Sequence, residues 1–350
     1  MIYLFNIGSL FIYSLLLRLI KLNRINRNKL LLFLFFFQLL IIHGLKNPDC
    51  FNDTPEYAQG FKEICWMDFS DYLVFGTIKA EIGYSFFMKL VSYISNNEQT
   101  IFVATSLVIV GCYIKAIKDY SMIPWMSIFL FLIGGFNQSM YVLRQHMAIA
   151  ILLLSFPYIL KRKFWMFLLI NILACSIHLT AIVFFPIYFI YKISLSKRNL
   201  ILLFLIGIIL RLIFNNTVVF IVGYLGIYSA YMDPDLAGTN LKVFILLLGI
   251  LCCCLVYMKK DYTAEGINKL LIMILIVGTI IQGIGIGNPI TGRLNMYYSN
   301  IIFLIFPNML FSITNKNMRY LFALTFLLFL SYFYLMNLQS MESYKFFWEL

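Results

Sequence analysis

Residues 137–192 read NQSMYVLRQHMAIAILLLSFPYILKRKFWMFLLINILACSIHLTAIVFFPIYFIYK, an almost wholly apolar stretch. It nevertheless contains Arg144 and His178, in sequence that we expect to lie within or beside a bilayer. An arginine in a transmembrane helix costs about 3 kcal/mol on insertion scales. A residue with that cost is expected to have a partner or a ligand, so its position relative to the membrane bears on function.

The composition of the chain is that of a membrane protein. Of its 350 residues, 62% are hydrophobic and 12% are charged, whereas soluble domains carry about 25% charged residues. Many apolar runs approach the roughly 20 residues that span hydrocarbon. We therefore predict an all-α polytopic membrane protein, with residues 1–350 forming a single integral-membrane domain.

The net charge of +12 is interpreted as a record of topology. Lysine and arginine accumulate in cytoplasmic loops, and no basic stretch is long enough to form a nucleic-acid interface. If every basic cluster lies in the cytoplasm, the chain makes about twelve crossings and both termini lie outside. The helices are then expected near 2–19, 30–43, 100–117, 122–137, 140–160, 200–214, 240–258, 269–287, 293–311 and 319–337.

Two segments depart from simple spans. Between Lys163 and Lys192 only about 28 residues are available for an even number of crossings, so residues 164–191 should form a short broken-helix hairpin. Such helices survive only against protein or a water-filled cavity. Residues 44–99 and 215–239 are expected as outer loops, and 81–95 as a re-entrant or interfacial helix.

This topology gathers ionisable residues at the outer face. Arginine forks match phosphate oxygens, although arginines near helix ends also snorkel to lipid headgroups. A histidine can accept a proton from an attacking hydroxyl at neutral pH, or it can simply cap or pack a helix. The residues gathered there are Asp53, Glu81, Arg144, His178, Arg211 and Arg293.

Several of these assignments remain open on the sequence alone. Asp53 could be a helix N-cap and Glu81 a first-turn acid; either could instead orient the histidine or bind a sugar hydroxyl. Cys50 and Cys65 share one outer loop, which leaves a disulfide open. No cysteine or histidine spacing indicates a metal site, so neither metal nor cofactor is expected.

The motifs resemble those of one family. The segment YVLRQHMAIAILLLSFPYILKRKFWMFLLINILACSIHLTAIVFFPIYF resembles the central region of EpsG-type and Wzy-type polysaccharide (O-antigen) polymerases, and DTPEY, EIGYSFFMKL and GRLNMYY are similar to the family's other recurrent pieces in the same order. The resemblance covers about residues 40–310. It implies a GT-C-like, metal-independent glycosyltransferase with many helices in the bacterial inner membrane.

The resemblance also implies the reaction and its partners. The growing glycan would pass from undecaprenyl pyrophosphate to a lipid-linked repeat unit at the periplasmic face, with both termini periplasmic. The expected partners are these undecaprenyl-pyrophosphate-linked oligosaccharides and the lipid bilayer, with no nucleic acid. A Wzz-type chain-length regulator is a candidate protein partner.

Residue roles follow from that reaction. Arg144 and Arg293, with Arg211, would stabilise the pyrophosphate leaving group. The acceptor hydroxyl needs activation, for which His178 is the first candidate and Glu81 or Asp53 the second. The candidate sugar-binding residues are Gln145, Tyr57, Trp66, Tyr84, Tyr141 and Tyr297.

Other activities fit the same features less well. An O-antigen ligase, or another glycosyltransferase for lipid-linked sugars, would share the donor and differ in the acceptor. A flippase for lipid-linked oligosaccharides would be expected to show repeated halves with charges near the bilayer midplane, and neither feature is evident. An acyltransferase would be expected to carry a His-Asp motif that this sequence does not contain.

Overall fold

The computed structural model describes residues 2–68, 81–225, 237–259, 265–286, 289–337 and 344–349. These residues are overwhelmingly helical, and the chain packs as two compact units. Unit 1 comprises Met1–Pro157, Trp165–Ile182 and Lys316–Leu350, and unit 2 comprises Tyr158–Phe164 and Val183–Asn315. This division is one of internal packing, and the single integral-membrane domain stays a prediction.

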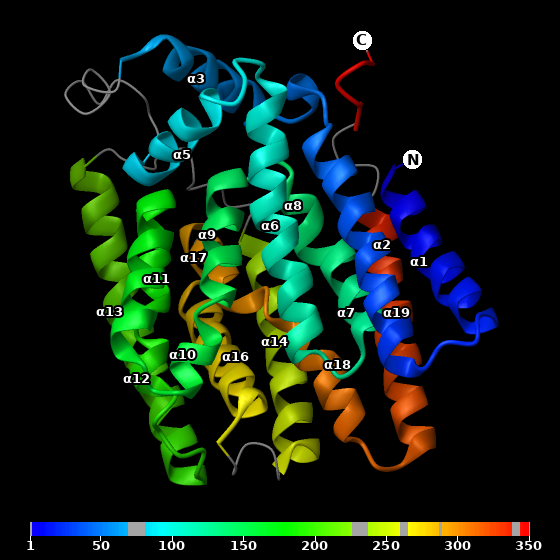
Figure 1. Ribbon diagram of the computed structural model, residues 1–350. Coiled ribbons are helices and arrows are strands. Elements are labelled where there is room, and N and C mark those ends of the chain that lie inside the picture. The colour runs from blue at the N-terminus through cyan, green and yellow to red at the C-terminus, as the bar shows by residue number, and fades with distance from the viewer. Residues whose placement is uncertain are drawn as a thin grey trace. The chain divides into compact units, whose positions relative to one another are not determined.

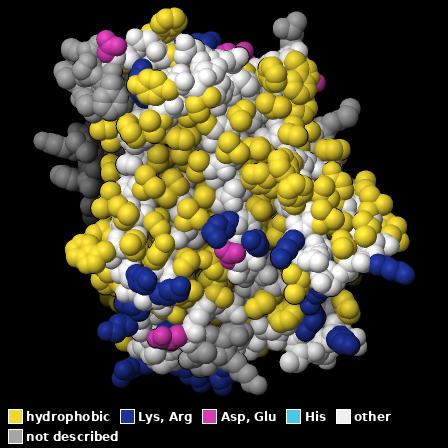
Figure 2. Space-filling view, in the orientation of Figure 1, with side chains coloured by type: hydrophobic (Ala, Val, Ile, Leu, Met, Phe, Trp, Pro, Cys, Tyr) yellow, Lys and Arg dark blue, Asp and Glu magenta, His cyan; other side chains and the backbone are white. Residues whose placement is uncertain are grey.

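Five helices of the described part are long and apolar enough to cross a membrane, or six if one bent pair counts as a span. Large apolar side chains such as Phe11 and Leu15 are exposed, and hydrophobic side chains cover much of the face seen in Figure 2. This is typical of a polytopic membrane protein, whereas about twelve crossings are not confirmed. The five helices are Ile2–Leu19, Arg24–Gly44, Gln99–Tyr120, Leu143–Leu160 and Ile267–Ile284.

Unit 1 is built around α6, which packs against α2 on one side and α9 on the other. Gln99, at the first turn of α6, donates from Nε2 to the carbonyl oxygens of Gly44 (2.5 Å) and Lys46 (3.1 Å), which fixes the end of α2. The helices of unit 1 are α1 (Ile2–Leu19), α2 (Arg24–Gly44), α3 (Thr54–Trp66), α5 (Ile82–Ser92), α6 (Gln99–Tyr120), α7 (Pro124–Phe131) continued by a π-helix (Leu132–Phe136) and α8 (Asn137–Ser139), α9 (Leu143–Leu153), α11 (Phe164–Ile177) and α19 (Lys316–Asn337).

The short helices α3 and α5 lie across the end of unit 1 at which α6 begins (Figure 1). Thr54 starts α3 by donating from its hydroxyl to the carbonyls of Pro48 and Phe51. Lys89 of α5 donates to the last carbonyls of α3, those of Ile64 (3.2 Å) and Met67 (2.6 Å). With 11 residues, α5 is too short to cross the membrane, in agreement with the short helix expected over 81–95.

The C-terminal segment folds back onto the same end of unit 1. Phe346 forms an antiparallel bridge with Lys46, and Tyr344 donates from its hydroxyl to the carbonyl of Ile42 at 2.7 Å. Cys50 contacts the backbone of this segment through its sulfur, and Cys65 is also a free thiol. The structure therefore does not contain the disulfide that the sequence left open.

Unit 2 packs its helices around α16, which contacts α13, α14, α17 and α18. Asn295 of α17 donates from its side-chain nitrogen to the side-chain oxygen of Gln282 of α16 at 2.6 Å. This bond joins two polar groups that are buried in the apolar packing. Its helices are α12 (Ile187–Ile190), α13 (Lys197–Leu225), α14 (Ala237–Tyr257), α16 (Ile267–Ile284), α17 (Pro289–Ser299) and α18 (Ile302–Ser312); α10 (Phe156–Leu160) and a 3-10 helix (Leu179–Phe184) cross the boundaries between units.

Three predicted boundaries are wrong. The helix expected from residue 30 begins at Arg24, because Asn23 caps it by accepting from the Asn26 amide at 2.8 Å and arginine and lysine are good helix formers. Residues 215–225, expected in an outer loop, are instead helical, since α13 continues to Leu225. The helix expected over 293–311 is two helices bent by 45°, with the break at Asn300 and Ile301; asparagine is a residue type that competes for backbone hydrogen bonds.

The predicted break near Ser176–His178 is confirmed. Helix α11 ends at Ile177 and the next helical turn begins at Leu179, so the break falls on His178. Much of the outer loop predicted over 215–239, and residues 69–80 of the loop over 44–99, lie outside the described residues.

Candidate active site

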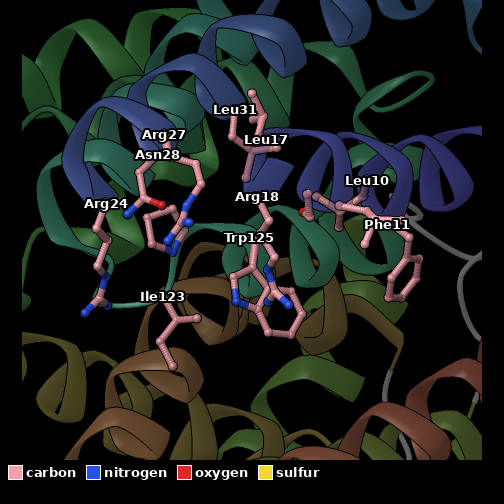
Figure 3. Close-up of a pocket in the computed structure, with 13 residues that line it drawn as sticks. Leu10, Phe11, Leu17, Arg18, Arg24, Arg27, Asn28, Leu31, Ile123 and Trp125 are labelled. Atoms are coloured by element: carbon pink, nitrogen blue, oxygen red, sulfur yellow. The ribbon is translucent and has the colours of Figure 1, made fainter. Parts of the chain in front are cut away.

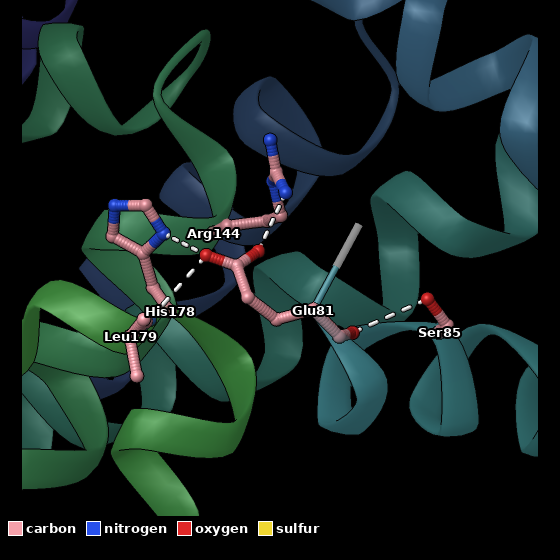
Figure 4. Close-up of polar contacts among 5 residues, drawn as sticks. All are labelled: Glu81, Ser85, Arg144, His178 and Leu179. Atoms are coloured by element: carbon pink, nitrogen blue, oxygen red, sulfur yellow. Dashed lines mark hydrogen bonds and ion pairs between the residues drawn. The ribbon is translucent and has the colours of Figure 1, made fainter. Parts of the chain in front are cut away.

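Three predicted site residues meet at one end of unit 1, with Glu81 between the other two (Figure 4). One carboxylate oxygen, Oε1, accepts from Nδ1 of His178 at 2.6 Å and from the Leu179 amide at 3.3 Å. The other, Oε2, accepts from a terminal guanidinium nitrogen of Arg144 at 2.5 Å. We call Glu81, Arg144 and His178 the polar triad.

Each residue of the triad stands at the end of a helix. Glu81 is the N-cap residue of α5, and its backbone carbonyl accepts from the Ser85 hydroxyl at 3.2 Å (Figure 4). Arg144 lies in the first turn of α9, and His178 follows the last residue of α11. Residues at helix ends are held by the helices yet leave the apolar packing, so a polar group can form there without a charge at the bilayer centre.

A glycine allows α5 to approach α11. A Cβ atom at Gly83 would lie 2.2 Å from Oγ, 2.6 Å from Cβ and 2.7 Å from the backbone carbonyl carbon of Ser176. Such distances are far below van der Waals contact, so no other residue fits without moving α5 or α11. Gly83 and Ser176 each stand two residues from a triad member, and their contact fixes the distance between Glu81 and His178.

The carboxylate is held in its ionised form. Burial alone would raise the pKa of Glu81, but the hydrogen bond from His178 and the charge of Arg144 outweigh it and lower the pKa from 4.5 to about 2. An ionised carboxylate only accepts hydrogen bonds, so the proton of the neutral imidazole must lie on Nδ1. The lone pair is then on Nε2.

That second ring nitrogen is available to a ligand. No hydrogen bond within the described part of the chain reaches Nε2 of His178, and the side chain is 24% exposed. A histidine whose Nδ1–H is held by a carboxylate and whose Nε2 is free is arranged to accept a proton.

Arg144 also faces an aromatic ring. Its guanidinium carbon lies 5.7 Å from the ring centroid of Tyr57 in α3, within the range of a cation–π contact. Burial raises the pKa of the Tyr57 phenol, against the opposing charge of Arg144. The arginine side chain remains 25% exposed, so the polar triad presents one cation and one imidazole to the surroundings.

Some predicted residues of unit 1 lie outside the triad. Asp53 is exposed and is the N-cap residue of α3, with no side-chain hydrogen bond to the helix. Trp66, at the end of α3, is 85% exposed, and the Tyr141 ring stacks on Phe51 at 6.0 Å. Within the described residues, no hydrogen bond or ion pair joins Asp53 to the triad.

Three predicted sugar-binding residues are buried. The side chains of Tyr84, Gln145 and Tyr297 are 0%, 3% and 4% exposed, so in this structure none of them offers a surface to a sugar. Gln145 directly follows Arg144, and Tyr84 lies three positions after Glu81, but both side chains turn toward the helix packing. Sugar binding by these three residues stays a prediction.

The other two predicted arginines belong to unit 2. Arg211 of α13 donates to the carbonyl of Gly283, at the end of α16, at 2.5 Å, which gives it a role in holding these two helices. Arg293 is exposed on α17. Pyrophosphate binding by either residue stays a prediction.

The fold and the triad together define a polytopic helical membrane protein with a histidine–carboxylate–arginine site at its helix ends. A family model for the EpsG family matches residues 2–349, nearly the whole chain, so the protein belongs to the EpsG family. The match confirms the resemblance and extends it beyond residues 40–310, and it fits a role in polysaccharide polymerisation. No curated protein and no solved structure was found to match the chain.

Proposed function

We propose that the protein is a polysaccharide polymerase of the O-antigen or capsule type, acting at the periplasmic face of a bacterial inner membrane. The growing glycan moves from undecaprenyl pyrophosphate to a hydroxyl at the non-reducing end of a lipid-linked repeat unit. The observation that carries the proposal is the polar triad, in a chain of the EpsG family.

In this mechanism His178 activates the acceptor. Its Nε2 takes the proton of the acceptor hydroxyl while the oxygen attacks the anomeric carbon of the donor sugar. The bond between that carbon and the pyrophosphate oxygen breaks, and undecaprenyl pyrophosphate leaves with the bonding electrons. Glu81 holds the imidazole by its Nδ1–H and stabilises the positive charge that the ring gains.

Arg144 is assigned to the leaving group. One terminal guanidinium nitrogen bonds Glu81 and the group faces the Tyr57 ring, yet its side chain is still 25% exposed, which leaves it accessible to a phosphate. Pyrophosphate carries more than one negative charge, and Glu81 already balances one positive charge, so a single arginine does not neutralise it. We therefore keep Arg293 as the second pyrophosphate-binding residue of the proposal.

The decisive experiment uses His178→Asn in the purified full-length protein. The asparagine side-chain nitrogen can replace Nδ1 as a donor to Glu81, while the variant lacks any atom in place of the basic Nε2. With undecaprenyl-pyrophosphate-linked repeat units as sole substrate, wild type should produce long glycans and the variant should lose about 10²- to 10⁴-fold in rate. Full activity of a folded His178→Asn variant would refute the assignment.

The acceptor separates polymerase from ligase. Repeat units alone should suffice for a polymerase, whereas a ligase would lengthen nothing until a lipid A core acceptor is added. Transport of labelled repeat units across proteoliposomes, with no longer product, would instead identify a flippase.

A further inference from the structure

A second polar site lies at the opposite end of α2 from the polar triad. A cavity of about 340 Å³ opens between the connection of α1 to α2 and the start of α7. Figure 3 shows Arg18, Arg24 and Arg27 extending from this connection toward Ile123 and Trp125. Because α2 has 21 residues, about 30 Å of helix separates this cavity from the triad end.

The cavity carries an unbalanced positive charge. Its lining contains three arginines and, as far as the described residues go, no aspartate or glutamate. The ion pairs found among those residues involve none of the three. Arg24 has a long bond to the carbonyl of Met122, at 3.3 Å, which does not offset its charge.

Two of the arginines stand where a helix favours the opposite charge. Arg24 and Arg27 lie in the first turn of α2, which contains no acidic residue. The free N–H groups at a helix N-terminus favour anions and disfavour cations. An anion in the cavity would balance both arginines and the helix end together.

Apart from Ser14 and Asn28, the remaining lining of the cavity is apolar, and its place between two candidate membrane-spanning helices puts it at the depth of lipid headgroups. Leu10, Phe11 and Leu17 of α1 line one side (Figure 3), and both α1 and α2 are long and apolar enough to cross a membrane. The connection between two such helices lies at the membrane boundary. Trp125 adds a residue type that favours this boundary.

We propose that this cavity binds an anionic phospholipid of the surrounding bilayer. The phosphate lies among Arg18, Arg24 and Arg27, and the acyl chains run along exposed side chains of α1 such as Phe11 and Leu15, which are 56% and 62% exposed. The occupant is a lipid instead of a soluble phosphate because the apolar wall of α1 continues directly from the arginines. This site is separate from the proposed reaction and does not depend on it.

The test counts lipids that stay bound to the purified full-length protein. Wild-type protein in nanodiscs of phosphatidylcholine with a minor fraction of phosphatidylglycerol is released into a mild detergent, and native mass spectrometry measures the retained lipids. We expect retained phosphatidylglycerol to exceed its share in the nanodisc at least tenfold. Retention in proportion to the bilayer composition would overturn the proposal without the need for any variant.

The variant arm assigns the site. Arg18→Gln, Arg24→Gln and Arg27→Gln together should reduce retained phosphatidylglycerol at least tenfold. The matched control, Lys192→Gln, Lys197→Gln and Arg198→Gln, removes the same charge from exposed positions of unit 2 and should retain the lipid. Equal loss of phosphatidylglycerol from both triple variants would show that net charge alone is responsible for its retention. Release of the lipid by millimolar inorganic phosphate would show that the site binds free phosphate. Either result refutes the lipid site.

Discussion

Replacing Glu81 by glutamine tests the logic of the polar triad most directly. The carboxylate accepts hydrogen bonds at both oxygens, from His178 and Leu179 at Oε1 and from Arg144 at Oε2. A glutamine amide accepts at only one side. If its oxygen faces His178, its NH₂ group meets the guanidinium of Arg144; if it is turned the other way, Nδ1 of His178 must become the acceptor and its proton must move to Nε2.

The structure indicates how large the effect should be. The surroundings lower the pKa of Glu81 from 4.5 to about 2, which corresponds to about 3 kcal/mol in favour of the ionised form. A glutamine cannot receive that stabilisation, and in its second orientation the imidazole no longer offers a lone pair at Nε2. We expect the polymerisation rate of Glu81→Gln to fall by about 10²- to 10⁴-fold, the range of general-base catalysis.

The measurement is the rate of glycan lengthening by purified protein at saturating lipid-linked repeat unit. Glu98→Gln is the matched control, because Glu98 is also the N-cap residue of a helix and also pairs with a cation, Lys62, at 2.5 Å. The control should keep its rate within about threefold, since exposed ion pairs contribute about 0–1 kcal/mol. Equal rates for the two variants, with both proteins monodisperse, would refute the role given to Glu81.

Three further outcomes follow from the same geometry. Gly83→Ala should lower the polymerisation rate at least tenfold. Adding Ser176→Gly should restore the rate only in part, because the backbone carbon of residue 176 would still lie 2.7 Å from the new Cβ. The control Gly249→Ala, whose new Cβ meets nothing within 4 Å, should behave as wild type in the same assay. Arg144→Lys should raise the KM for the lipid-linked donor at least tenfold in steady-state kinetics, because a compact ammonium cannot contact Glu81 and a phosphate with one planar fork. The pKa of Glu81 is lowered on folding, so its ionised form adds stability above pH 4.5 that is lost as the pH falls toward about 2. The Tm in detergent should therefore fall over that pH interval by more in wild type than in Glu81→Gln. Parallel curves of Tm against pH for the two proteins would contradict the lowered pKa.

The sequence was sufficient to bring together residues that lie far apart in the chain. Positive loops set which helix ends share a face, and that rule alone placed Glu81, Arg144 and His178 at one end, 97 positions apart at the extremes. It could not say which acid would face the histidine. The rule placed both Asp53 and Glu81 at the same end as the histidine. Which of the two meets it depends on how α5 contacts α11.

That contact carried a weak sequence signal. Gly83 stands between Ile82 and Tyr84 in a mostly apolar helix, where glycine costs about 1 kcal/mol of helix stability relative to alanine. An unfavourable residue in a short helix indicates a close approach, but only coordinates identify Ser176 as the neighbour. The buried position of Gln145 could not be predicted for a similar reason, since the side chain directly after a site residue on a helix points about 100° away from it.

Helix ends were the least predictable part of the fold. The Asn-Asn pair 215–216 predicts the start of a loop, yet α13 continues to Leu225. Conversely, the segment 293–311 reads as one apolar helix and is bent by 45°. Local propensities differ by less than about 1 kcal/mol per residue, so packing against neighbouring helices decides such ends.

The polar triad also links donor binding to acceptor activation within the proposed reaction. One carboxylate oxygen of Glu81 pairs with Arg144 and the other pairs with His178. A pyrophosphate that draws the guanidinium toward itself leaves more of the carboxylate's charge to act on the Nδ1–H of His178, which makes Nε2 a better proton acceptor. The imidazole would thus gain basicity when the leaving group is in place, and a shared carboxylate, unlike two separate ion pairs, provides this link without any movement of the helices.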